Sequence, residues 1–153
     1  MNYEQARAYA VNVSRSGSIL GLDSIENLMH ELGDIQERLK IIHIAGTNGK
    51  GSTGAYLERV LIEARYRVGR YSSPAVFDPM EVWRINLQSM SHEEYADIME
   101  QVKCACDRMV EKGMEHPTIF EVETAMAFLY FYQKKCDYVL LEVGMGGRTD
   151  ATN

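Results

Sequence analysis

A glycine-rich stretch with one lysine and two hydroxyl residues follows an apolar run in the first third of the chain. It reads Gly46-Thr-Asn-Gly-Lys-Gly-Ser52, after the β-branched run at residues 40–45 and before a helical pattern at residues 52–65. Glycines let the backbone turn its N–H groups toward an anion, and the start of a helix adds partial positive charge. A lysine at this place can reach the β- and γ-phosphates of a nucleotide, and a serine can offer its hydroxyl to Mg²⁺ or phosphate. The order strand, loop, helix therefore favours a phosphate-binding loop.

The loop departs at two positions from the standard phosphate-binding pattern G-x-x-x-x-G-K-[ST]. Ile44 stands where the first glycine of that pattern would be, and Gly51 follows Lys50 where a hydroxyl residue is expected. The alternative is a tight glycine turn with an exposed lysine and no ligand. On this loop alone, both interpretations stay open.

The elements that must position this loop alternate between strands and helices. Buried strands are predicted at residues 40–45, 67–72 and 137–143, and helices at 3–13, 23–33, 52–65, from Ser91 onward and from Thr118 onward. Capping boxes open the last two helices, and the helix after Thr118 is apolar almost all round, so it should be buried. Residues 73–90 form the irregular part. Alternating strands and helices predict an α/β fold with a mainly parallel sheet flanked by helices.

Composition bounds the class of protein and its partners. The 153 residues are about one domain long, and 46% hydrophobic with 25% charged residues is typical of a soluble globular protein. A net charge of -6 argues against a broad nucleic-acid surface. The three cysteines form no C-x-x-C pair, and the sequence has neither a signal-like N-terminus nor an apolar run long enough to cross a bilayer. We therefore expect a cytoplasmic protein with free thiols and with no nucleic-acid or membrane partner.

Two segments resemble the signatures of one enzyme family. A-G-T-N-G-K-G-S at residues 45–52 resembles the nucleotide loop of the folylpolyglutamate synthase/dihydrofolate synthase family, a branch of the Mur ligase superfamily. L-L-E-V-G-M-G-G-R-T-D-A-T-N at residues 140–153 is similar to that family's E-V-G-x-G-G-x-x-D-x-T-N signature. Weaker matches are Y-S-S-P at 71–74 and F-E-V at 120–122. The resemblance implies a P-loop NTPase-like fold of the Mur ligase central-domain type.

The resemblance also implies roles for individual residues. The ATP phosphates would be wrapped by six loop residues: Thr47, Asn48, Gly49, Lys50, Gly51 and Ser52. Ser73 and Glu142 would hold Mg²⁺, while Lys50 and Glu142 would carry the catalytic charge stabilisation. Arg148 and Asp150 would lie near the nucleotide and the metal.

The physical chemistry of Glu142 agrees with a cation at that position. An acid in an apolar strand is costly to ionise unless a cation compensates it, and Mg²⁺ would be its natural partner at a strand end opposite a phosphate loop. The alternative is a structural carboxylate that accepts hydrogen bonds from backbone N–H groups. Glu121 and Glu123 compete for the metal role, but Glu121 has a structural task in its capping box, and Glu123 fits the polar edge of its helix. His43, in the strand before the loop, fits a core residue better than a catalyst.

The segment at residues 73–86 departs from the family pattern. In the family, this loop helps to form the pteridine site and carries S-P-H followed by an arginine-rich run, whereas this chain has S-P-A-V-F-D-P-M-E-V-W-R-I-N-L. Trp83, Phe77 and Tyr71 could stack on a pterin ring, although aromatic residues near a loop more often complete a core. Folate is therefore a weaker expectation than ATP.

The reaction that the family implies is ATP-dependent amide formation. A substrate carboxylate, from folate or dihydropteroate, takes the γ-phosphoryl group to give an acyl phosphate, and the amine of L-glutamate displaces phosphate. By the same resemblance, residues 1–153 would be the N-terminal part of the ATP-binding domain, without the rest of that domain and without the C-terminal glutamate-binding domain. We expect this piece to bind nucleotide weakly and to form no amide bond, and the whole enzyme to be a monomer.

Three other functions stay open from the sequence. One is a Mur-type ligase acting on another carboxylate, such as a cell-wall precursor. The second is a P-loop NTPase that couples hydrolysis to a partner, although Gly51 and Glu142 stand where that class has a hydroxyl residue and an aspartate. The third is a nucleotide-binding module without catalysis.

Overall fold

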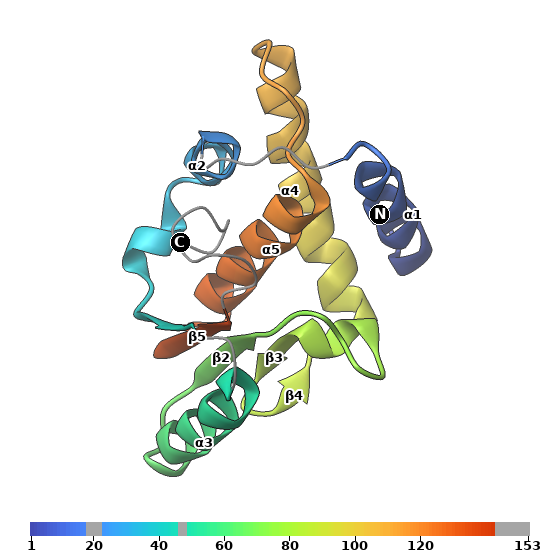
Figure 1. The fold of residues 1–153 in the computed structure, drawn as a ribbon. Coiled ribbons are helices and arrows are strands. Elements are labelled where there is room, and N and C mark those ends of the chain that lie inside the picture. The colour runs from blue at the N-terminus through green and yellow to red at the C-terminus, as the bar shows by residue number, and fades with distance from the viewer. Residues whose placement is uncertain (18–22, 46–48, 143–153) are drawn as a thin grey trace.

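The structure is a computed structural model that describes residues 1–17, 23–45 and 49–142, with the side chain of Lys50 outside the described part (Figure 1). The helices are α1 (Tyr3–Ser14), α2 (Asp23–Glu31), η1 (Ile35–Arg38), α3 (Lys50–Glu63), η2 (Pro79–Val82), α4 (His92–Glu111) and α5 (Ile119–Gln133). The strands are β1 (Ile41–Ile44), β2 (Val68–Tyr71), β3 (Trp83–Ile85), β4 (Gln88–Ser89) and β5 (Tyr138–Glu142).

The strands form one sheet in the order β1-β5-β2-β3-β4. The first three strands are parallel, with Ile44 opposite Glu142 and Tyr71 opposite Leu141. Their carboxyl ends therefore meet at one edge of the sheet, where ligands bind in open α/β folds. The predicted α/β fold is confirmed. Glu142 lies at the end of β5, the central strand of the three parallel strands.

The other two strands lie in the segment that the sequence predicted to be irregular. β2 pairs antiparallel with β3, and β3 pairs antiparallel with β4. The hairpin turns at Asn86 and Leu87, whose φ angles of 47° and 70° fit a two-residue hairpin loop. The side-chain oxygen of Asn86 accepts a hydrogen bond from the Val68 backbone N–H at 2.8 Å, which fixes the turn against the start of β2.

Helices cover the two faces of the sheet unequally. Figure 1 shows α3 alone on one face and α1, α2, α4 and α5 together on the other. The larger hydrophobic core lies under the four helices, and a smaller cluster of Ile44, Val68 and Leu140 lies under α3. Both predicted capping boxes form, at Ser91 before α4 and at Thr118 before α5, and the central residues of α5 are buried as predicted.

The sequence predicts a strand buried on both faces at residues 40–45, but β1 is only partly buried. It is an edge strand of the described sheet, and only Ile44 is fully buried. His43 points to the face opposite Ile44 and is exposed, so the prediction that it is a core residue is wrong.

All three cysteines are free thiols, as predicted. Among the described residues, none of the helices combines the length and the apolar character that a membrane span requires.

Candidate functional site

The described part of the glycine loop forms the start of α3. Gly49 is the residue before the helix and has a φ of 78°, a left-handed conformation that glycine adopts at little cost. Among the described residues no side chain caps this end of the helix, and Gly51 and Ser52 are exposed. Uncapped N–H groups at the start of a helix are donors for a phosphate. The predicted ligands Thr47 and Asn48 and the side chain of Lys50 lie outside the described residues.

Two predicted metal ligands lie at the carboxyl edge of the parallel strands. Glu142 ends β5, and its side chain is 15% exposed. Ser73 lies two residues beyond the end of the neighbouring strand β2 and is exposed. Since β2 and β5 are paired in register up to Tyr71 and Leu141, both side chains lie at the same edge of the sheet.

A buried arginine connects Glu142 to the start of α3. The Nη2 atom of Arg70 on β2 donates to Glu142 Oε1 at 3.0 Å and to the backbone oxygen of Gly51 at 3.3 Å. One nitrogen thus bridges the acid and the first turn of the helix. A guanidinium of the chain itself therefore lies beside Glu142, a partner that the sequence did not predict.

A buried glutamate on α3 holds the other side of this guanidinium. Arg70 Nη1 donates to Glu58 Oε1 at 3.2 Å, and Nη2 of Arg84 lies 3.5 Å from the same oxygen. Arg70 and Arg84 are cross-strand partners in β2 and β3, and like charges opposite each other destabilise a sheet. Glu58, only 1% exposed, is therefore their shared counterion.

Neither Arg70 nor Glu58 was among the predicted site residues. The sequence held one signal for each: Arg70 stands in the middle of a strand, and Glu58 lies one helical turn after Gly54. On α3, Gly54 and Glu58 are buried and face Arg70, whereas Val60 is 44% exposed. Gly54 leaves room for the arginine, since a Cβ there would lie 2.9 Å from Arg70 Nη2.

The two competing glutamates on α5 have different environments. Glu121 is buried, and its backbone N–H donates to Thr118 Oγ1 at 3.3 Å, so its predicted capping role is confirmed. Burial raises the pKa of Glu123 to about 7, although Arg7 opposes the shift. Glu123 is partly buried on α5, so the polar edge that the sequence predicts is only partly exposed.

The aromatic residues near Ser73 divide between core and surface. Tyr71 and Trp83 are core residues, each 1% exposed, and the Trp83 indole N–H donates to the backbone oxygen of Glu123. Phe77, in contrast, is 94% exposed. Of the three aromatic side chains that could stack on a ring, only Phe77 is accessible.

Glu81 fixes the backbone that presents Phe77. Its Oε1 accepts hydrogen bonds from the N–H groups of Val76 at 2.5 Å and Phe77 at 2.6 Å. Hydrogen bonds from Phe77, and then from Val76 and Asp78, hold the pKa of Glu81 below its ordinary value. The exposed aromatic ring thus stands on an ordered turn.

The oxygen groups at the sheet edge fit a hard divalent cation. Among residues 1–17, 23–45 and 49–142, no three His, Cys, Asp or Glu side chains gather as a complete metal site. Mg²⁺, however, is usually held by one or two carboxylates together with phosphate oxygens and water. Glu142, which Arg70 links to the start of α3, and Ser73, just beyond the end of β2, suit that incomplete protein ligand set.

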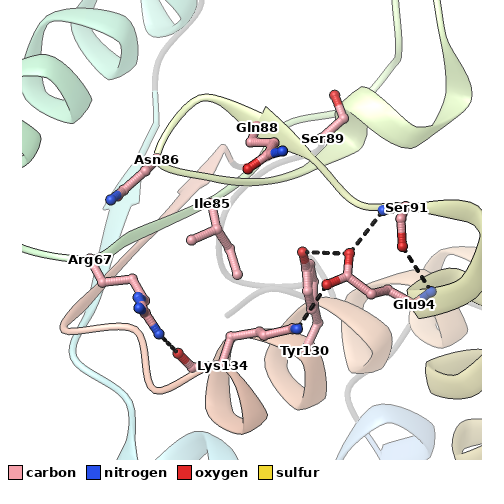
Figure 2. A pocket seen from close by; sticks show the side chains of 9 residues that line it. All are labelled: Arg67, Ile85, Asn86, Gln88, Ser89, Ser91, Glu94, Tyr130 and Lys134. Carbon is pink, nitrogen blue, oxygen red and sulfur yellow. Dashed lines mark hydrogen bonds and ion pairs between the residues drawn. The ribbon is translucent and has the colours of Figure 1, made fainter.

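One pocket of about 490 Å³ lies elsewhere, between the β3–β4 hairpin and the C-terminal end of α5 (Figure 2). Glu142 is at the opposite end of the parallel strands, because the pocket is lined by Arg67, which precedes β2. The charged groups of the pocket already bond to one another: Lys134 Nζ lies 2.8 Å from Glu94 Oε1, and Arg67 donates to the Lys134 backbone oxygen at 2.7 Å. We therefore place the candidate site at the sheet edge.

Comparison with known proteins confirms the predicted resemblance, although no family model matches the chain. The chain is 38% identical over 152 residues to the dihydrofolate synthase/folylpolyglutamate synthase of Bacillus subtilis, which covers 99% of this chain and 35% of that protein. The chain thus spans about a third of the length of this curated relative.

Solved structures give the same result for the fold. A folylpolyglutamate synthase from Thermotoga maritima matches with a TM-score of 0.89 and 39% identity, over 98% of this chain and 35% of that one. A bifunctional folylpolyglutamate synthase/dihydrofolate synthase with Mn, AMPPNP and L-glutamate bound matches with a TM-score of 0.85 and 38% identity, over 96% and 35% of the two chains.

Proposed function

Because the chain matches the folylpolyglutamate synthase/dihydrofolate synthase family in sequence and in fold, we propose that the protein is an ATP-dependent ligase that adds L-glutamate to a folate or dihydropteroate carboxylate. One observation on this chain's own residues supports the proposal. Arg70 Nη2 contacts both Gly51 and Glu142, so the start of α3 and the acid at the end of β5 share one site.

In this proposal, the loop and the helix start hold the nucleotide. Backbone N–H groups around Gly49 and Gly51 bind the phosphates, together with Thr47, Asn48 and the hydroxyl of Ser52. The ammonium group of Lys50 would neutralise the charge of the transferring phosphoryl group, as the family resemblance implies. The related enzyme with bound AMPPNP supports a nucleotide of this kind.

Ser73 and Glu142 would hold the divalent cation, which we propose is Mg²⁺. When bound, such a cation neutralises phosphate charge during the transfer. The related enzyme carries Mn, which prefers the same oxygen ligands.

The chemistry that follows needs no nucleophile from the protein. The substrate carboxylate takes the γ-phosphoryl group and becomes an acyl phosphate, and the amine of L-glutamate then displaces phosphate to form the amide. The protein binds and orients the reactants, which is the main source of rate in phosphoryl transfer. Phe77, exposed beyond Ser73, offers an apolar surface to the ring of a folate acceptor.

A binding measurement on Lys50 tests the nucleotide site. Loss of a hydrogen bond between charged groups costs about 1.5–3 kcal/mol, so Lys50→Ala should weaken Mg-ATP binding about 10- to 100-fold in calorimetry. Lys112→Ala, at the end of α4 on the opposite face of the sheet from α3, should bind as the unmodified protein does. Equal affinity of the Lys50 and Lys112 variants would contradict the proposed loop function.

A further inference from the structure

The ion pairs around Glu142 form a connected group that we name the Arg70 network: Glu58, Arg70, Arg84 and Glu142. Its side chains come from α3, β2, β3 and β5, and Arg70 is at the centre, bonded to both glutamates. With two acids and two arginines, the network is neutral when all four groups are charged. At the sheet edge, the side chain of Glu142 is therefore held by Arg70 through one of its two oxygen atoms.

The network holds only one oxygen of Glu142. Arg70 bonds to Oε1, so Oε2 is outside this ion pair. The same guanidinium nitrogen bonds to the Gly51 backbone oxygen, which fixes the carboxylate relative to the first turn of α3. Glu58 holds Arg70 from the other side and limits its movement away from Glu142.

The network is poorly built for stability. Glu58 Oε2, Arg70 Nε and Arg84 Nε are buried and have no hydrogen-bond partner among the described residues. Buried ion pairs of this kind are often no better for stability than apolar side chains of similar volume. Stability is therefore a weak explanation for two opposite charges buried between α3 and the sheet.

We propose that Arg70, held by Glu58, is a positioning residue that orients Glu142 toward a divalent cation bound with the nucleotide. This inference rests on the proposed function, because it needs a metal–nucleotide complex at the sheet edge. A carboxylate that binds a metal is commonly held by an outer hydrogen-bond partner, and loss of such a partner costs about 10- to 100-fold in metal affinity.

The test is a paired substitution in the full-length protein. Glu58→Met with Arg70→Met removes one buried charge of each sign and keeps apolar volume, so it should destabilise the protein less than Arg70→Met alone, although Arg84 and Glu142 each lose a partner. The affinity of the protein–AMPPNP complex for Mn²⁺, measured by electron paramagnetic resonance of free Mn²⁺, should fall about 10- to 100-fold. AMPPNP binding in the presence of EDTA should change much less, because Arg70 bonds to the backbone oxygen of Gly51 and not to the N–H groups that are proposed to bind the phosphates.

Two further variants keep the test decisive. Arg67→Met is the matched control, since Arg67 precedes β2 at its other end and bonds to Lys134, and it should leave Mn²⁺ affinity unchanged. Arg70→Lys keeps the charge but loses the planar fork that serves three acceptors, so it should give a smaller loss and allow the test if the paired variant does not fold. If the Arg70 variants bind Mn²⁺ as tightly as the unmodified protein does, this inference is overturned and the proposed function stays intact. Absence of Mn²⁺-dependent nucleotide binding in the unmodified protein would overturn both.

Discussion

At the scale of single residues, the site depends on what surrounds each charge. Glu142 is an acid at the end of an apolar strand, yet Arg70 compensates it within the chain. Glu123 is an acid without an ion pair among the described contacts, and burial raises its pKa to about 7. Two glutamates that look equivalent in sequence therefore have different electrostatic surroundings.

Glu123 should make the stability of the protein depend on pH. Its folded pKa of about 7 lies above the ordinary value of 4.5, so the folded state binds more protons between these values. The stabilising contribution is complete below pH 4.5 and is lost as the pH rises through about 7. Glu123→Gln should raise the free energy of unfolding at pH 8 by about 1–3 kcal/mol and have little effect near pH 5.

Urea unfolding at pH 5, 6, 7 and 8 measures this effect. Glu115→Gln is the control, because Glu115 is exposed before α5 and should change the pH profile little. A parallel shift of the Glu123→Gln profile at every pH would contradict the assignment of the pH dependence to Glu123.

Some candidate site residues could be singled out from the sequence, whereas the residues that contact them in the fold could not. The glycine loop and Glu142 have recognisable types and spacing, so they could be found without a structure. Glu58 and Arg70 could not, because their partners come from different elements that only the folded sheet brings together. The prediction that His43 is a core residue was wrong for a similar reason, because its exposure depends on which strand lies at the edge of the sheet.

At the scale of elements, hydrogen bonds between residues close in sequence determine where α4 and α5 begin, whereas the β3–β4 hairpin depends on a contact with β2. The side chains of Ser91 and Thr118 each accept a hydrogen bond from the backbone N–H three residues later. Because this contact involves only four consecutive residues, it can be recognised in the sequence. The β3–β4 hairpin has only short strands and an Asn-Leu turn, which is a weak signal on its own. Its turn is completed by the Val68 N–H of another strand.

The contact between β2 and α5 requires a glycine in the strand. A Cβ at Gly69 would lie 2.5 Å from Cδ1 and 2.7 Å from Cγ of Phe131, whose side chain is fully buried. Gly69→Ala should therefore destabilise the protein by about 1–3 kcal/mol, because neither the strand nor the ring can move freely in a packed core. Chemical denaturation followed by circular dichroism measures the loss.

A double-mutant cycle separates this clash from a general effect of the substitution. Phe131→Leu removes ring atoms, so the Gly69→Ala/Phe131→Leu variant should be less destabilised than the sum of the single variants. If the two effects simply add, the close contact does not explain the need for glycine at this position.

At the scale of the whole molecule, the two faces of the sheet differ in how much they bury. One large hydrophobic core contains residues from every described helix except α3 and from β2, β3 and β5. α3 packs on a small cluster of three buried residues and leaves Tyr56 74% exposed. The alternation of strands and helices predicted the α/β class, but not the strand order or this asymmetry, because both are set by packing between distant segments.

This asymmetry predicts that α3 opens more easily than the rest of the fold. Elements with few buried apolar contacts open locally at a lower free energy than the core. In native-state hydrogen exchange, amides in the middle of α3 should exchange through openings of lower free energy than those in the middle of α5. Equal protection of the two helices would contradict the prediction.

Ligand binding should reduce that difference, because the proposed phosphate site is the start of α3 itself. A ligand at 100 times its dissociation constant stabilises the bound state by about 2.7 kcal/mol, so Mn²⁺ with AMPPNP should slow exchange in α3 by up to about 100-fold. Amides of α5 should slow only where they exchange by global unfolding. In Lys50→Ala the same ligand concentration should protect α3 much less, since the site is then only partly occupied. Protection of α3 to the same extent in both proteins would show that stabilisation of this helix does not depend on the lysine of the loop.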